Sequence, residues 1–164
     1  MIRDLGPGDL SEWRRIRAEG LRLFPEAFLT TLEEELARSD AEVTRSLNGR
    51  LVLGCFDGDR LIGTAALDAA VEAEAATHRG ALNAFCVSPD YHGTGTGTRL
   101  LRAAIDRAAA EGRLQLELFV AAHNAPAIRL YERHGFVRHG VLPRAARIGD
   151  RFVDDLFYVR QLDG

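Results

Sequence analysis

The spacing of hydrophobic residues changes several times along the chain, and each change predicts a different kind of secondary structure. Between Thr98 and Gly112 apolar residues recur every three or four positions, which predicts a helix with one apolar face. Gly112 stands where the C-terminal cap of that helix is expected. From Leu114 to Val120 every second residue is leucine or valine, and this alternation predicts a strand.

Two helices are predicted before the first strands. Asp9 is a candidate N-cap for a helix that runs to about Leu23 and ends before the proline that follows. Thr30 or Thr31 can cap a second helix, whose first turn holds the three glutamates of residues 33–35. We expect these carboxylates to form a solvated face that is favoured by the positive end of the helix dipole.

A run of strands is predicted next. Residues 51–56 and 61–67 are apolar segments joined by residues 57–59, an Asp-Gly-Asp turn of the kind that closes β-hairpins. Residues 81–87 are a further predicted strand. The alanine- and glutamate-rich residues 69–77 show no clear period, and they are either a strand extension or a loop.

The C-terminal part alternates helix and strand. Asn124 is a predicted N-cap, an early proline follows it, and Gly135 ends that helix. Residues 136–137 and 152–159 are the last predicted strands. This order predicts an α/β (α+β) domain that spans residues 1–164, with a mixed sheet and helices on its faces.

Composition and charge narrow the classes of protein to which the chain can belong. A net charge of −3, with 46% hydrophobic and 27% charged residues, is typical of a soluble globular protein and a poor match to nucleic acid. The two cysteines suit a reducing compartment, and no segment has the features of a signal peptide or a membrane span, so we expect a cytoplasmic protein. Neither C-x-x-C nor H-x-x-x-H occurs, so we expect no metal.

The strongest candidate for chemistry is the segment from Val87 to Thr98, where a strand runs through alternating glycines into the predicted helix. Such a turn leaves backbone N–H groups open at a helix N-terminus, where phosphate binds. ATP and NAD are alternatives, but the segment lacks the Gly-Lys-Ser/Thr of a P-loop, and its G-x-G-x-G differs from the dinucleotide fingerprint.

Two motifs in this order resemble the GCN5-related N-acetyltransferase (GNAT) superfamily. The window from His92 to Gly97 is similar to the Gln/Arg-x-x-Gly-x-Gly/Ala motif of the family, with histidine in place of arginine or glutamine. The segment from Leu118 to Phe136 resembles the family's L-x-V…N…A…LY…GF run, with matches at Asn124 and Tyr131. The resemblance implies a GNAT-like acyl-CoA N-acyltransferase fold with a mostly antiparallel central sheet.

The resemblance implies acetyl-CoA as cosubstrate. Its pyrophosphate would be held mainly by backbone N–H groups of the turn, formed by His92, Gly93, Thr94, Gly95, Thr96, Gly97 and Thr98. Phe85, Cys86 and Val87 would bind the pantetheine arm, with the Val87 N–H as oxyanion donor. Asn124 would add a bond to that arm or only cap its helix. Tyr131 would protonate the leaving thiolate, or it is only a packed core residue.

The sequence leaves the general base open. Some family members carry a glutamate where this chain has Ala84, and no carboxylate occurs between Gly80 and Val87. A proton relayed through water is our first expectation, and Asn83 could hold a water. Other side chains could reach the acceptor side from elsewhere in the chain: Glu72, Glu74, His78, His123 and Asp155. A covalent acetyl-Cys86 intermediate is disfavoured, because no histidine is placed by sequence to activate the thiol.

The function predicted from these residues is transfer of an acetyl group from acetyl-CoA to a primary amine, by direct attack in a ternary complex. The acceptor is a small-molecule amine or a peptide amine, and no pattern in the sequence identifies it. A non-catalytic module that senses acyl-CoA is the alternative, and the missing glutamate at Ala84 is its best support. The resemblance also makes a homodimer a possible assembly.

Overall fold

Seven strands form one mixed sheet in the order β1-β2-β3-β4-β5-β7-β6. The structure is a computed structural model that describes residues 1–164. Its strands are β1 (Ile2–Asp4), β2 (Leu51–Asp57), β3 (Arg60–Ala69), β4 (Arg79–Val87), β5 (Gln115–Ala121), β6 (Val137–Ile148) and β7 (Arg151–Gln161). Its helices are α1 (Leu10–Leu23), α2 (Leu32–Ala37), α3 (Asp40–Gly49), α4 (Thr96–Ala110) and α5 (Ala125–Arg133).

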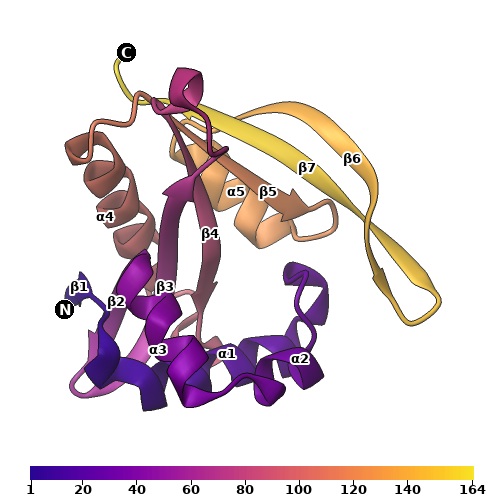
Figure 1. Cartoon of the computed structure of the whole chain (residues 1–164). Helices are drawn as coiled ribbons and strands as arrows, with labels where there is room; N and C mark the ends of the chain where they lie inside the picture. The colour runs from indigo at the N-terminus through magenta and orange to yellow at the C-terminus, as the bar shows by residue number, and fades with distance from the viewer.

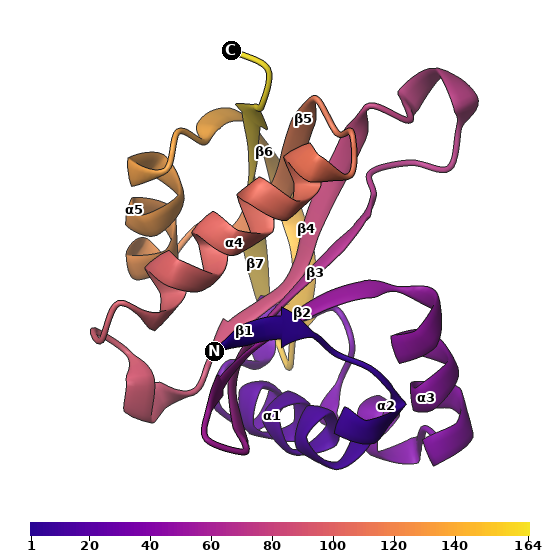
Figure 2. The ribbon, with the colours of Figure 1, turned by 90° about the vertical axis from the view of Figure 1, so that its left-hand side faces the viewer.

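Helices cover both faces of the sheet (Figures 1 and 2). The α4 and α5 helices lie together on one face, and α1, α2 and α3 gather at the other. Strand β2 shows why two cores result, because its alternate residues point to opposite faces. Leu53 and Cys55 belong to the core under α4, whereas Val52 and Phe56 belong to the core under α1 and α3.

The predicted mixed, mostly antiparallel sheet is confirmed, because β4 and β5 are its one parallel pair. The predicted hairpin is also confirmed: β2 pairs with β3 around Gly58, which has the positive φ of 58° that such turns need. Residues 69–77 were predicted as either a strand extension or a loop. Strand β3 ends at Ala69, and the residues after it form a loop with a 3₁₀ turn at Glu74–Ala76.

No helix is both long and apolar enough to cross a lipid bilayer.

Two helix predictions need correction, and one helix was not predicted. Asp9 stands at the N-cap of α1, but its carboxylate accepts from Gly6 N (2.9 Å) and from the Arg3 guanidinium instead of capping the helix. The second helix ends at Ala37, and a separate helix, α3, begins after Ser39. Glu35 is not part of a solvated face, because it is 4% exposed.

The last hairpin is longer than the sequence predicts. Strand β6 continues to Ile148, and Figure 1 shows β6 and β7 extending well beyond the body of the sheet. A proline at residue 143 and a positive φ of 51° at Arg144 interrupt the alternating pattern that would have revealed β6. Both are tolerated because β6 is an edge strand with a bulge between Leu142 and Ala146.

Candidate active site

A gap opens between β4 and β5 in the middle of the sheet. The two strands pair in parallel at residues 79–81 and 115–117, and no pairing follows beyond Ala81. A bulge in β4 accompanies this divergence: the register against β3 shifts between Thr64 and Ala66, and Ala84 has a φ of 47°. The backbone of β4 from Leu82 onward therefore has a free edge on its β5 side.

The peptide groups of Val87 point into this gap. Ser88 N donates to Ile62 O of β3 at 2.8 Å, and successive N–H groups along a strand point to opposite sides. The Val87 N–H is therefore directed away from β3, toward β5. His92 Nε2 lies 2.8 Å from Val87 O, so the histidine that departs from the family motif is held against the end of the same strand.

The glycine turn leads from this strand end into α4. Gly93 and Gly95 have φ values of 74° and 84°, and Gly95 is the N-cap of the helix. A Cβ at either position would meet no atom within 4 Å, so the turn faces open space. The hydroxyls of Thr94 and Thr96 lie 2.9 Å apart and are engaged within the turn. The first N–H groups of α4 have no acceptor in the helix and remain available to an anion.

Gly97 and Thr98 lie in the first turn of α4. Gly97 has no positive φ, and a Cβ there would meet Leu130 Cδ2 at 3.4 Å and Val87 Cγ2 at 3.9 Å, which are ordinary contacts. The protein itself therefore has room for alanine at residue 97.

Tyr131 lies on α5 beside the gap. Its ring makes edge contacts with Phe85 and Phe136, at centroid distances of 5.9 and 5.8 Å, and the residue is 6% exposed. Burial, with a smaller effect of nearby Cys86, raises the pKa of the Tyr131 hydroxyl. The phenol therefore stays protonated at neutral pH, and its O–H is a potential proton donor beside β4.

Asn124 caps α5, as the sequence predicts. Its Oδ1 accepts from Ala127 N at 3.4 Å, which leaves the two amide donors of its Nδ2 free. Asn124 follows the end of β5, so it stands on the opposite side of the gap from Val87. The capping and ligand-binding roles are therefore compatible.

The Cys86 side chain lies on the opposite face of β4 from its two neighbours. It packs against the core under α1, whereas Phe85 and Val87 pack against the core under α4. Its Sγ lies 3.2 Å from Thr64 Oγ1. Desolvation raises the pKa of the Cys86 thiol, opposed by Thr64 and by the charge of Arg17. No histidine contacts it, so the thiol has no base to activate it.

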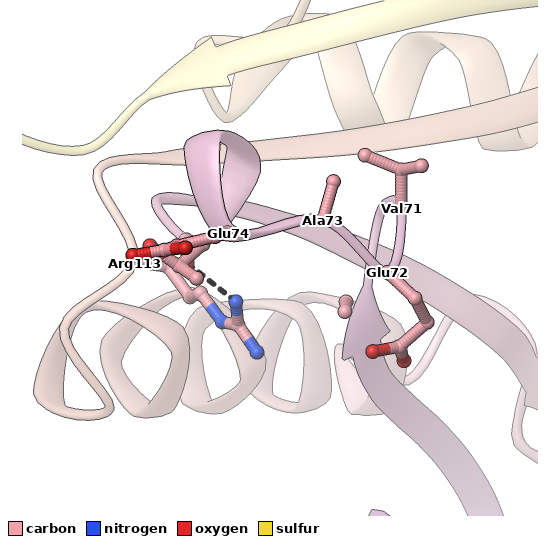
Figure 3. A pocket seen from close by; sticks show the side chains of 7 residues that line it. Val71, Glu72, Ala73, Glu74 and Arg113 are labelled. Atoms are coloured by element: carbon pink, nitrogen blue, oxygen red, sulfur yellow. Dashed lines mark hydrogen bonds between the residues drawn. The ribbon is translucent and has the colours of Figure 1, made fainter.

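Most of the candidate bases do not reach this gap. His78, Glu72 and Glu74 lie before β4, whereas Val87 ends it, and about 25 Å of extended strand separates the two ends. Glu72 and Glu74 instead line a surface pocket of about 390 Å³ beside Arg113, which Figure 3 shows. The pocket is lined by Ala69, Val71, Glu72, Ala73, Glu74, Thr77 and Arg113.

Asn83 is also engaged elsewhere. Its Nδ2 donates to Asp68 at 2.8 Å, and Asp68 forms a two-point ion pair with Arg50 at 2.8 and 2.6 Å. Burial opposes the charge of Asp68, but its bonds to Arg50 and Asn83 hold the pKa of its carboxyl below its ordinary value. Asn83 is thus a member of a paired charge network.

His123 and Asp155 do lie at the open end of the gap. Asp155 pairs with Ala121 at the end of β5, and burial, with a smaller effect of Asp154, raises the pKa of its carboxyl. His123 Nε2 is 3.4 Å from Glu26 Oε1. Glu26 belongs to a 3₁₀ turn, Pro25–Ala27, that contacts both β5 and β6.

The same turn region also reaches the other side of the gap. The rings of Phe24 and His92 lie 6.1 Å apart by centroid. Phe24 therefore meets the segment after β4, while Glu26 meets the segment after β5. The chain from Phe24 to Glu26 thus links the two segments that follow the diverging strands.

One buried charged residue that the sequence did not single out lies on α1. Arg17 has an 11% exposed side chain and approaches Glu35 of α2 at 3.8 Å. A signal existed in the sequence, because Arg17 stands four residues from both Trp13 and Leu21 and thus on the buried stripe of α1.

No group of three or more histidine, cysteine, aspartate or glutamate side chains is placed to hold a metal ion.

Comparisons with known proteins agree on one family. The chain matches the Acetyltransferase (GNAT) family over residues 13–136. It is 32% identical over 151 residues to a mycothiol acetyltransferase of Sanguibacter keddieii, covering 91% of this chain and 47% of that protein. It is 35% identical over 77 residues to an L-methionine sulfoximine/L-methionine sulfone acetyltransferase of Pseudomonas paraeruginosa, covering 47% and 45%.

The fold is shared from end to end with solved structures. The crystal structure of a GNAT superfamily phosphinothricin acetyltransferase from Sinorhizobium meliloti, in complex with AcCoA, superposes with a TM-score of 0.85 at 25% identity. That superposition covers 99% of this chain and 88% of the other. The chain spans less than half the length of the curated relatives it matches. Because the family matches over most of its length, this chain belongs to the Acetyltransferase (GNAT) family.

Proposed function

We propose that this chain is an acetyl-CoA-dependent N-acetyltransferase that transfers acetyl to a primary amine by direct attack in a ternary complex. One observation carries the proposal: the gap between β4 and β5 has the Val87 N–H on one side, Tyr131 beside it and the glycine turn at its end. These are the parts that such a transfer needs. We treat residues 1–164 as the unit that carries the activity.

The glycine turn suits the pyrophosphate of CoA. The N–H groups at the start of α4 are unpaired within the helix, and the helix dipole favours negative charge there. The open space over Gly93 and Gly95 leaves room for phosphate oxygens at the backbone. His92 stands beside the same turn, and its bond to Val87 O fixes the end of β4 in place.

Acetyl-CoA, when bound, supplies the thioester from which the amine takes the acetyl group. Along Phe85, Cys86 and Val87 alternate peptide groups of β4 point away from β3, and this free edge is suited to hydrogen bond the pantetheine arm. The Val87 N–H is a fixed dipole directed at the gap, and a donor of this kind contributes about 3 kcal/mol to other acyl transfers. The free amide donors of Asn124 are placed to bind the arm from the other side.

Tyr131 supplies the proton that the leaving thiolate needs. A CoA-type thiolate with a pKa of about 8.5 benefits from a neighbouring acid. Burial keeps the Tyr131 hydroxyl protonated, so it can donate a proton as the C–S bond breaks. The attacking amine loses its own proton through water, with His123 and Asp155 as the titratable groups at the open end of the gap.

The acceptor is a small-molecule amine or a peptide amine. The names of the relatives support a small molecule: one is a mycothiol acetyltransferase and another acetylates methionine sulfoximine and methionine sulfone. A homodimer is the assembly we expect. Light scattering of the purified chain tests it directly.

A thermal-shift titration with acetyl-CoA, dephosphorylated CoA and ATP tests the cofactor first. A ligand that binds the native state raises the unfolding temperature with concentration, so acetyl-CoA should give a saturating shift and ATP none. A thiol-release assay with an amine panel then tests transfer. Two results together would support the acyl-CoA-sensing alternative instead. One is saturable acetyl-CoA binding without thiol release, and the other is a Tyr131→Phe variant with the same binding and thiol release as the parent.

A further inference from the structure

Arg17 carries a buried guanidinium without a hydrogen bond. Its side chain is 11% exposed, its Nε is fully enclosed without a partner, and the nearest carboxylate oxygen, Glu35 Oε2, is 3.8 Å from Nη2. A buried N–H donor without a partner is costly, so the enclosed Nε of Arg17 is unsatisfied. Arg17 therefore has unused binding capacity.

Two aromatic rings hold Arg17 in place. Its Cζ lies 4.8 Å from the ring centroid of Phe28 and 5.5 Å from that of Trp13. Phe28 is itself pressed against α1 at Gly20, where an added Cβ would come within 3.0 Å of its ring. A stacked arginine loses little freedom on binding, so this fork is prepared for a planar anion.

Glu35 does not form a hydrogen bond with the Arg17 guanidinium. Glu35 is 4% exposed, and both of its carboxylate oxygens are enclosed and accept no hydrogen bond. Its nearest cations are Arg17 Nη2 at 3.8 Å and Arg38 Nη1 at 3.6 Å, both beyond hydrogen-bonding distance. A well-formed buried ion pair would be shorter and hydrogen bonded, so this pair is looser than a structural bridge requires.

Arg17 has no carboxylate of its own. Arg17 and Arg38 both approach the single carboxylate of Glu35, and the nearby Arg50 is paired with Asp68. A carboxylate from a ligand would supply acceptor oxygens to the N–H groups of Arg17.

The position of Arg17 connects this site to the acetyl donor. Arg17 lies over the ring of Phe28, two residues after Glu26, which contacts His123 at the open end of the gap. It also lies over Trp13, which belongs to the core that Cys86 of β4 packs against. We infer that Arg17 binds a carboxylate of the acceptor, which makes the acceptor an amino acid or a close analogue with its amine near an acid group. This rests on the proposed acetyl transfer.

The test compares acids with their amides. The twenty common amino acids, each paired with its carboxamide, are assayed for thiol release with acetyl-CoA and for thermal shift of the acetyl-CoA-bound protein. We expect at least one acid to be preferred over its amide by about 10- to 100-fold in kcat/KM, the range for a charged hydrogen bond. Arg17→Met should abolish that preference by raising KM for the acid alone.

Two further variants separate recognition from folding. Arg17→Lys keeps the charge but not the fork, so it should recover part of the preference. Arg22→Met, at an exposed position in the last turn of the same helix, should leave the preference and the acetyl-CoA shift unchanged. If Arg17→Met fails to fold, two results still test carboxylate binding: the acid-to-amide ratio of kcat/KM in the parent, and the same ratio in Arg17→Lys.

The outcomes distinguish the two proposals. Amides or simple amines acetylated as well as the acids, or a preference that survives Arg17→Met, would refute carboxylate binding and leave the acetyltransferase proposal standing. No acetyl-CoA shift and no thiol release would refute the acetyltransferase proposal. In that case carboxylate binding by Arg17 is judged by thermal shift alone, and equal shifts with acid and amide would refute it as well.

Discussion

Alanine at Gly97 and at Gly95 should separate cofactor binding from stability, because the two glycines occur for different structural reasons. Gly95 has a φ of 84°, and a left-handed conformation costs a non-glycine residue about 1–2 kcal/mol. At this chain length 1 kcal/mol lowers the unfolding temperature by about 2–4 °C. We therefore expect Gly95→Ala to unfold about 2–8 °C below the parent.

Gly97→Ala should behave in the opposite way. Residue 97 is helical, and the new Cβ would make ordinary contacts at 3.4 and 3.9 Å. Since alanine is favoured over glycine in a helix by up to about 1 kcal/mol, the unfolding temperature should be unchanged or higher. If phosphate approaches this turn closely, the same Cβ should weaken acetyl-CoA binding, because glycine in such turns lets the backbone approach the pyrophosphate.

Gly112→Ala is the matched control. It has the same φ of 84°, but it lies at the far end of α4. It should lose stability as Gly95→Ala does and keep the acetyl-CoA affinity of the parent. Thermal unfolding and isothermal titration calorimetry on the three variants give both quantities. Parent-like affinity in Gly97→Ala and Gly95→Ala alike would show that the pyrophosphate does not bind at this turn.

Three further predictions concern the acid, a helix cap and acid stability. Tyr131→Phe should fold normally, because its hydroxyl makes no bond within the protein, yet lose about 10²-fold in kcat; an unchanged kcat would exclude Tyr131 as the acid. Ser39→Ala removes the bond from Glu42 N to Ser39 Oγ (3.2 Å) and should cost about 1 kcal/mol in thermal unfolding, while an unaltered unfolding temperature would mean that α3 does not need its cap. The Arg79 guanidinium holds the pKa of Glu117 below its ordinary value, so this carboxylate stabilises the fold at neutral pH. That contribution should be lost as the pH falls below about 4.3 and through the lower folded value, and Glu117→Gln should flatten the acid limb of the stability curve; an unchanged acid limb would contradict this assignment.

Local features of the sequence determined the elements that depend on neighbouring residues. The apolar period of α4, the cap at Asn124 and the Asp-Gly hairpin were predicted correctly, because each depends on contacts within a few residues. The glycine turn was located for the same reason, since positive φ at Gly93 and Gly95 is a local requirement.

Only the tertiary structure decided where β4 leaves β5. The gap exists because pairing stops at Ala81 and a bulge follows at Ala84, and the two strands are separated by the whole of α4. Strand divergence and register depend on long-range hydrogen bonds, which no local pattern encodes. The direction of the Val87 N–H and the place of Tyr131 beside it follow from that divergence.

Burial of charge was likewise beyond the sequence. Glu35 belongs to a run of three glutamates that reads as a solvated face, yet the packing of α2 against α1 encloses it beside Arg17. The sequence by itself determined the elements, their order and the turn suited to phosphate. The tertiary structure decided which charges are left without partners, because that depends on which helices meet.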